Sequence, residues 1–334
     1  MSYFIPKGYE SLLSLYETQT AIGILKRLFE DNLACELNLK RVSAPLFVEP
    51  CSGLNDDLGG TERAVEFVVK ETGGTVQIVH SLAKWKRLAL HRYGFPLQTG
   101  LYTDMNAIRR DDEMDNLHSI YVDQWDWEKI ITPEQRDINY LCETVNKIVT
   151  AVCSTAKMLQ MHFPIIAPQI VQNVKFITSQ ELLDIYPGLS DKERENAITE
   201  KYKTVFIMKI GGALSNGKPH DTRAPDYDDW QLNGDILFWH EPLGCAMEIS
   251  SMGIRVDAAT LDKQLTLAGC DHRRSLLYHK ELLAGSLPLS IGGGIGQSRL
   301  SMLLLKKVHV GEVQVSVWDA DTIEECGAAG VELL

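Results

Sequence analysis

Short runs of residues that favour β-strands come in clusters along this chain, rather than alternating one by one with helical segments. The β-like runs are 65–69, 76–79, 120–127, 205–210, 236–239 and 246–250. Apolar residues at helical spacing predict helices over 9–34, 81–93, 137–162, 257–284 and 297–306. Strict alternation would predict a parallel sheet, whereas clustered strands predict an α+β fold with a mainly antiparallel sheet flanked by helices.

The chain opens with a long amphipathic helix followed by an extended segment. The helix is predicted over 9–34, and the extended residues 39–48 are interrupted by Pro45. Because proline lacks a backbone N–H, we expect this strand to lie at a sheet edge or to end there. Further along, Ser190 and Glu193 have the spacing of a capping box and predict another helix start.

The composition limits the partners and the compartment. There are 33 Lys and Arg residues against 45 Asp and Glu, a net charge of −12, which argues against nucleic-acid and membrane surfaces as partners. No apolar run approaches the roughly 18 residues of a membrane span. Seven scattered cysteines without a C-x-x-C pair fit the reducing cytoplasm. Since no repeat or linker divides the chain, we expect a single domain over 1–334.

Three segments come close to common site motifs but fail at the residues that carry the chemistry. Residues 212–219 nearly form a P-loop, yet Pro219 stands where a hydroxyl must bind magnesium, so a Gly/Asn turn is the better interpretation. A dinucleotide fingerprint starting at Gly292 would need its third glycine where Arg299 stands. Cys51 has no neighbouring base in the sequence and is interpreted as a bystander thiol.

The segment 292–303 carries the strongest functional signal. Its glycines let a ligand approach the backbone closely, and Arg299 opens an apolar helix whose N-terminus can face the same phosphate chain. A tight glycine packing site with a surface arginine is the alternative. The strand and helix over 289–307 resemble motif 3 of class II aminoacyl-tRNA synthetases, a resemblance that implies ATP binding by Gly294, Gly296 and Arg299.

Residues 100–128 resemble motif 2 of the same class, a hairpin of two antiparallel strands. The resemblance assigns Arg109 to the ATP α-phosphate and His118 to the polyphosphate end. Val122 stands where the class usually has a phenylalanine that stacks on adenine. Residues 1–48 resemble motif 1, through which this class dimerises, and so imply a homodimer, although an ordinary strand ending at a proline explains the pattern too.

Two further segments resemble parts of the class that bind substrate and metal. Residues 80–86 resemble the segment with which aspartyl- and asparaginyl-type members hold their amino acid, and Ser81 and Lys86 stand in the matching places. The intervening Lys84 is interpreted as a solvated helix charge.

Residues 233–257 resemble the strand pair that holds Mg²⁺ in this class. The matching oxygen ligands are Asp235, Glu248 and Ser251, and Arg255 of the same segment is assigned to ATP. Hard oxygen donors suit a magnesium ion shared with phosphates. Carboxylates at the edge of a sheet are the alternative interpretation.

The most extensive resemblance, from about Leu39 to about Trp318, is to the ammonia-dependent aspartate–ammonia ligases, the A-type asparagine synthetases. The strings that carry it are 80–86, 121–128, 223–230, 250–257 and 292–300. It implies that ATP, L-aspartate and ammonia yield L-asparagine, AMP and diphosphate through a β-aspartyl adenylate. The glutamine-using asparagine synthetases need a cysteine after the initiator methionine, where this chain has Ser2.

The resemblance also implies roles around the substrate. Lys86 would pair with an aspartate carboxylate, and Gln124 and Ser81 would orient the substrate. Asp56 and Asp226 are candidates to bind an amino group or to deprotonate ammonium, in either order. The remaining predicted substrate contacts are Asp123 and Asp126. Independently of the family, Gln124, Asp126 and Glu128 alternate with two tryptophans and so predict a polar pocket on one strand face.

Two other functions fit parts of this pattern. A tRNA-charging enzyme reduced to its catalytic domain would activate the α-carboxylate of its amino acid. A non-catalytic, synthetase-like regulatory protein would not need Arg109, Arg299 and Glu248 together. Their joint presence favours an enzyme.

Overall fold

A large mixed sheet organises the molecule, for which a computed structural model describes residues 4–56, 58 and 62–334. Ser2 lies outside these residues. Within them, eight strands form one sheet in which β1–β5 and β7–β8 pair in parallel and the other pairs are antiparallel. In spatial order the strands are β1 (Leu39–Arg41), β5 (Gly100–Ile108), β6 (Tyr121–Ile130), β11 (Ser290–Gly296), β10 (Cys245–Arg255), β9 (Asp228–His240), β8 (Thr204–Met208) and β7 (Lys175–Thr178). The predicted α+β fold with a mainly antiparallel sheet is confirmed.

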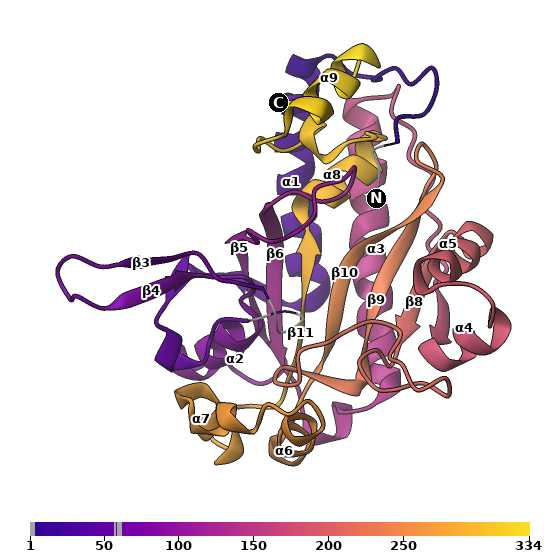
Figure 1. Cartoon of the computed structure of the whole chain (residues 1–334). Helices are drawn as coiled ribbons and strands as arrows, with labels where there is room; N and C mark the ends of the chain where they lie inside the picture. The colour runs from indigo at the N-terminus through magenta and orange to yellow at the C-terminus, as the bar shows by residue number, and fades with distance from the viewer. Residues whose placement is uncertain (1–3, 57, 59–61) are drawn as a thin grey trace.

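One face of this sheet is covered by long helices. Figure 1 shows α1 (Leu15–Leu37) and α3 (Ile138–His162) running behind the strands, with α8 (Gln297–Leu305) above them. Their apolar side chains and the inward residues of the strands, Trp125 and Trp127 among them, form the main core. Because neighbouring side chains on a strand alternate between faces, the residues beside these tryptophans point to the other side of the sheet.

The opposite face is only partly covered. Helix α2 (Ala83–Arg92) packs on β6 and β11, and α5 (Asp191–Tyr202) packs on β8, β9 and β10. The other α-helices are α4 (Ser179–Ile185), α6 (Ala258–Leu267), α7 (Leu277–Leu283) and α9 (Ala320–Ala328), and short 3₁₀ turns span Pro50–Ser52, Pro133–Gln135, Asp271–Ser275 and Val310–Glu312. Since α2 and α5 stand apart, the middle of the sheet between them remains open to a ligand.

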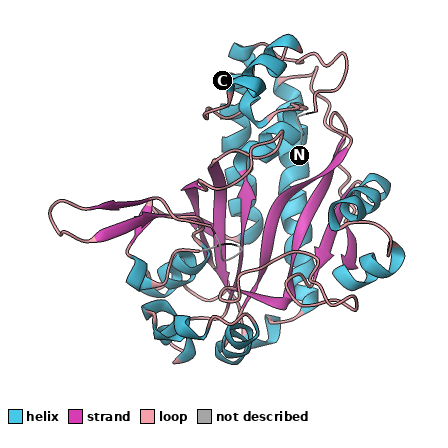
Figure 2. Ribbon diagram, viewed as in Figure 1, coloured by secondary structure: helices cyan, strands magenta, loops and turns pink. Residues whose placement is uncertain are grey.

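A smaller three-stranded sheet projects from the body of the protein. It consists of β2 (Phe47–Val48), β4 (Thr75–Ile78) and β3 (Glu66–Val68), and Figure 2 shows the β3–β4 hairpin extending away from the large sheet. The segment predicted as one strand over 39–48 is therefore divided at Pro45 between two sheets. Its first part, β1, lies at the edge of the large sheet, as predicted for a strand that ends near Pro45.

Two predicted helices have different limits in the structure. The first helix begins at Leu15 because Ser14 and Glu17 form a capping box that starts it there. The helix predicted over 257–284 is broken at Gly269, whose φ of +66° ends α6 before α7 begins. No helix in the described part of the chain is long and apolar enough to cross a membrane.

Candidate active site

A cavity of about 570 Å³ lies on the open face of the large sheet, and we call it the central cavity. Strands β6, β10 and β11, the start of α8 and the loops around 109–119 and 221–227 contribute to its wall. It brings together most of the residues predicted from sequence: Asp56, Ser81, Lys86, Arg109, His118, Asp123, Gln124, Asp126, Glu248, Ser251, Arg255, Gly294, Gly296 and Arg299. Val122 lines it as well. Asp226 and Asp235 are not part of its lining.

The strand register explains how residues far apart in sequence meet here. Ser251 pairs with Asp235 on one side and with Gly294 on the other, and Gly294 pairs with Asp126. These four residues therefore form one row across four strands. A methyl group at position 294 would overlap Oε1 of Gln124, so any larger residue there would displace this side chain. The glycine strand thus gives room to the polar side chains of β6.

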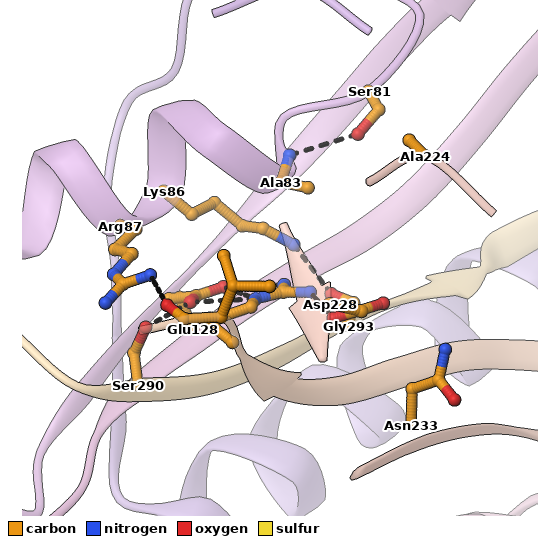
Figure 3. Close-up of polar contacts among 12 residues, drawn as sticks. Ser81, Ala83, Lys86, Arg87, Glu128, Ala224, Asp228, Asn233, Ser290 and Gly293 are labelled. Atoms are coloured by element: carbon orange, nitrogen blue, oxygen red, sulfur yellow. Dashed lines mark hydrogen bonds and ion pairs between the residues drawn. The ribbon is translucent and has the colours of Figure 1, made fainter. Parts of the chain in front are cut away.

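Lys86 and Asp126 form an ion pair in the floor of the central cavity. Nζ of Lys86 also donates a hydrogen bond of 2.8 Å to the carbonyl of Gly293, and Figure 3 shows the side chain reaching from α2 toward that residue. Burial lowers the pKa of Lys86. Oδ2 of Asp126 is buried and has no hydrogen-bond partner among the described residues, so this oxygen can accept a hydrogen bond from a ligand.

Arg255 lies deeper, in a buried ionic cluster. Its Nη2 is 2.7 Å from Oε2 of Glu128, and its Nη1 donates to Asp228. Ser290 donates to the same Glu128 at 2.7 Å, and the two residues lie side by side in Figure 3. Burial opposes ionisation of Glu128, but Arg255 outweighs it and holds the pKa of this carboxyl below its usual range. Because two carboxylates neutralise Arg255, its position fits a role in supporting the cavity floor better than the predicted contact with ATP.

Arg109 and Arg299 differ from Arg255 in having uncompensated charge. Arg109 donates to the carbonyl of His80 at 3.4 Å, and Arg299 donates to the carbonyl of Glu248 at 3.1 Å. Neither guanidinium forms an ion pair with a carboxylate among the described residues. Both line the central cavity, so their positive charge is available to an anionic ligand.

The predicted magnesium ligands lie beside a further arginine. Arg223 forms ion pairs with Asp235 and with Asp221, the latter at 2.7 Å. Burial and the nearby Glu248, opposed by Arg223, raise the pKa of Asp235 to about 7. Oδ1 of Asp235 is buried and unpaired within the described residues, and Glu248 and Ser251 line the cavity next to it.

These donors fit a magnesium ion that is shared with substrate phosphates. Mg²⁺ is commonly held by one or two carboxylates that share it with substrate phosphates. The described residues contain no group of three His, Cys, Asp or Glu side chains that could hold a metal without such a substrate. Asp235, Glu248 and the hydroxyl of Ser251 are oxygen donors of the kind that an ion shared with phosphates takes.

Asp226 lies outside the cavity, in a buried cluster with a lysine, an arginine and a histidine. Its Oδ2 is 3.1 Å from Nζ of Lys84, 2.9 Å from Nη1 of Arg273 and 2.9 Å from Nε2 of His279. The interpretation of Lys84 as a solvated charge is wrong, because its side chain is only 3% exposed. The position of Asp226 does not favour the predicted substrate contact.

Two other predicted aspartates line the cavity with protein partners of their own. Oδ1 of Asp123 accepts hydrogen bonds from Oγ of Ser298 at 2.6 Å and from Gln314 at 3.2 Å. The carbonyl of Asp56 lies 2.9 Å from Nδ1 of His80. Asp123 therefore ties α8 to β6, whereas Asp56 comes from the loop at the other side of the cavity.

Sequence reasoning missed several residues of the cavity wall, among them Lys192, Arg223, Tyr227 and Asp228. Arg223, Tyr227 and Asp228 stand in the string 223–230, of which only Asp226 was given a role. Lys192 had no signal beyond the capping box beside it. These residues come close to the site through the long-range packing of α5 and of the loop before β9, which no local sequence pattern encodes.

Comparison with known proteins identifies the family. The family model described as aspartate-ammonia ligase matches residues 16–330. The chain belongs to the aspartate–ammonia ligase family. A relative from Clostridium perfringens with that name is 57% identical over 332 residues and is covered over 99% of both chains. The corresponding protein of Levilactobacillus brevis is 54% identical over 335 residues and 100% of both chains. The chain is thus an enzyme that joins carbon to nitrogen, an ATP-dependent ligase of aspartate and ammonia.

Solved structures confirm the class II synthetase fold of this ligase. Asparaginyl-tRNA synthetase from Pyrococcus horikoshii, complexed with asparaginyl-adenylate, matches with a TM-score of 0.65 and 15% identity over 90% of this chain and 68% of that one. Aspartyl-tRNA synthetase from Entamoeba histolytica matches with a TM-score of 0.60 and 17% identity over 91% and 58%. At such identities the likeness concerns the fold alone.

Proposed function

We propose that the central cavity is where the ligase activates the β-carboxylate of L-aspartate with ATP and then presents the β-aspartyl adenylate to ammonia. One observation carries the proposal. Arg109 and Arg299, which have no carboxylate partner among the described residues, line the same cavity as the Lys86–Asp126 pair and its unpaired oxygen. The cavity thus offers positive charge to a phosphate chain and an acceptor to an ammonium group.

The chemistry proceeds in two displacements. A β-carboxylate oxygen attacks the α-phosphorus of ATP, and diphosphate leaves. Ammonia then attacks the β-carbonyl carbon, and the bond between this carbon and the oxygen that joins it to AMP breaks. AMP leaves with that oxygen, and the new nitrogen loses one proton to give the amide. Charge develops on the phosphate oxygens in the first step, where Arg109 and Arg299 can stabilise it.

For aspartate, we assign the α-ammonium to the unpaired Oδ2 of Asp126. Lys86, which forms an ion pair with Asp126 in the floor, is assigned to a carboxylate of the substrate. Ser81 and Gln124 line the same part of the wall and orient the substrate. Asp123 acts indirectly in this scheme, because it fixes Ser298 at the start of α8.

Ammonium must lose a proton before the resulting ammonia can attack, and a carboxylate facing the cavity can accept that proton. We assign this role to Asp56, which lines the cavity, in preference to Asp226, which does not. When bound, Mg²⁺ would supply charge neutralisation at the phosphates, held by Asp235, Glu248 and Ser251.

The wider organisation is proposed as follows. The chain forms a single catalytic domain over 1–334, works as a homodimer in the cytoplasm and needs neither nucleic acid nor membrane. The exposed edge of β1 and the adjoining α1 within residues 1–48 support the proposed interface, since β1 lies at the end of the large sheet. Light scattering at micromolar concentration should give twice the mass of the chain. A stable monomer would reject the dimer.

Product analysis tests the proposed function. The ligase is incubated with ATP and aspartate together with ammonium, glutamine or tRNA as the only acceptor or nitrogen source. When ammonium is the nitrogen source, we expect asparagine, AMP and diphosphate to form in equal amounts. Equal asparagine formation from glutamine in ammonia-free buffer, or aspartyl-tRNA as the product, would contradict the proposal.

A further inference from the structure

Lys192 reaches the central cavity from an unexpected direction. It stands in the first turn of α5, which contributed only a capping box to the sequence analysis. Its side chain is 63% exposed, and the residue lines the cavity. A ligand in the cavity can therefore meet its ammonium group without displacing any packed side chain.

The ammonium of Lys192 is held in place by a buried support. Its Nζ lies 2.9 Å from Oε2 of Glu195, and the second oxygen of Glu195 lies 3.1 Å from Nε2 of His220. Glu195 is 8% exposed and His220 is 3% exposed. Most exposed lysines lose much rotamer freedom on binding, whereas an ammonium anchored on a buried carboxylate is already oriented.

The same support fixes the loop that carries two other residues of the cavity wall. His220 is followed directly by Asp221, and Arg223 comes two positions later. Glu195 consequently joins the start of α5 to this loop through one carboxylate. Burial opposes the charged form of Lys192, but Glu195, Glu248 and Asp221 outweigh burial and raise its pKa.

The strand register indicates which end of the cavity Lys192 faces. Helix α5, which carries Lys192, is tied to β10 beside Glu248, because Oδ1 of Asn196 accepts a hydrogen bond of 2.8 Å from the N–H of Ala246. The carbonyl of Glu248 in turn accepts the hydrogen bond of Arg299. Met252 pairs with Gly293, the residue bound by Lys86, and lies four positions beyond Glu248 on β10. At roughly 3.3 Å per residue, the ends marked by Glu248 and by Lys86 are about 13 Å apart. Lys192 thus belongs to the Arg299 end.

We infer that Lys192 binds the β- or γ-phosphate of ATP and then the diphosphate that leaves, with Glu195 and His220 as its positioning residues. This inference rests on the proposed placement of the phosphates beside Arg299. An ammonium has three N–H donors, so the bond to Glu195 leaves two for phosphate oxygens. Lysine is a compact point charge, which suits a phosphate chain that must depart after the first step.

The first experiment uses inorganic diphosphate as the probe. For Lys192→Gln we expect the inhibition constant of diphosphate against ATP and the KM for ATP to rise about tenfold, as for the loss of one charge-assisted hydrogen bond. The KM for aspartate should stay unchanged. Lys192→Arg should retain most of the affinity. Lys201→Gln, on the exposed last turn of the same helix, is the matched control and should behave like the parent.

The role of Glu195 in positioning Lys192 is tested with Glu195→Gln, which should weaken diphosphate binding less than Lys192→Gln does. Adding Glu195→Gln to Lys192→Gln should weaken diphosphate binding no further. Calorimetric titration of diphosphate separates the two proposals, because it does not depend on turnover. If the parent made no asparagine but bound diphosphate through Lys192, the proposed function alone would fail. Unchanged diphosphate affinity in Lys192→Gln, or a raised KM for aspartate instead, would overturn the assignment of Lys192.

Discussion

Lys84 and Asp226 form an ion pair of 3.1 Å that is sealed inside the protein, whereas Lys86, two positions along the same helix, pairs with Asp126 in the cavity floor. Helix α2 therefore directs two lysines to two aspartates with different surroundings. Asp226 contacts Lys84, Arg273 and His279 outside the cavity, whereas Asp126 lines the cavity and has one oxygen without a partner among the described residues. The first pair is expected to govern stability and the second to govern chemistry.

Lys84→Met should destabilise the fold without removing the chemistry. Breaking a buried ion pair by removing one partner typically costs about 3–5 kcal/mol, and the remaining contacts of Asp226 with Arg273 and His279 favour the lower end. The urea midpoint should fall, while kcat/KM for ATP of the folded enzyme stays close to that of the parent. Lys280→Met, an exposed change on α7, serves as the control. A large loss of kcat with an unchanged urea midpoint would show that Lys84 acts in catalysis.

The same cluster predicts how stability depends on pH. Burial would raise the pKa of Asp226, but Lys84, His279 and Arg273 outweigh burial and hold it well below its usual range. Because the folded pKa lies below the unfolded value of about 3.9, the stabilisation is present above that pH and is lost as the pH falls below it. Urea titrations between pH 6 and pH 3 should therefore show a smaller acid loss in Asp226→Asn than in the parent. Parallel pH profiles would exclude this contribution.

Local sequence patterns predicted much of the frame of this site. The glycine strand, Arg299 and the polar face of β6 were found in this way, because glycine freedom, helix starts and strand alternation are local properties, whereas Arg109 was found through the family resemblance. The burial of Lys84 could not be predicted in this way. Periodicity assumes that a helix has a solvent side, yet residues Ala83 to Leu90 of α2 are all buried between the sheet and other segments.

Two glycines of β11 provide a matched pair of substitutions. A methyl group at Gly294 would overlap Oε1 of Gln124, whereas one at Gly296 would lie 3.4 Å from Cβ of Arg299, an ordinary contact. Gly294→Ala should displace Gln124 and raise the KM for aspartate about tenfold, the effect of losing roughly one hydrogen bond. Gly296→Ala should change it much less. Similar values for the two variants would mean that Gln124 does not orient the substrate.

Glu248→Gln should reveal the magnesium ligands. The change keeps the shape and one acceptor oxygen but removes the charge, so turnover should fall and the magnesium concentration for half-maximal rate should rise. The melting temperature without nucleotide should change little, since Glu248 is only partly buried. Glu241→Gln, in the exposed turn between β9 and β10, is the control. A magnesium titration identical to that of the parent would remove Glu248 from the ligand set.

Electrostatic roles were harder to derive from sequence than positions. Arg255 and Arg299 both looked like phosphate ligands. Only the tertiary structure shows that Glu128 and Asp228 neutralise Arg255, while Arg299 meets carbonyls and no carboxylate within the described part of the chain. Asp226 looked like a substrate contact for the same reason. A charged residue in a family string carries no local signal of the partner that folding will bring to it.

Isotope transfer tests the central claim, adenylation of the β-carboxylate, most directly. L-Aspartate labelled with oxygen-18 in the β-carboxylate is incubated with the ligase, ATP, magnesium and ammonium, and the products are examined by mass spectrometry. The proposed mechanism predicts one labelled oxygen in the phosphate of AMP and the other in the amide carbonyl of asparagine. Unlabelled AMP, or label in inorganic phosphate beside ADP, would contradict it.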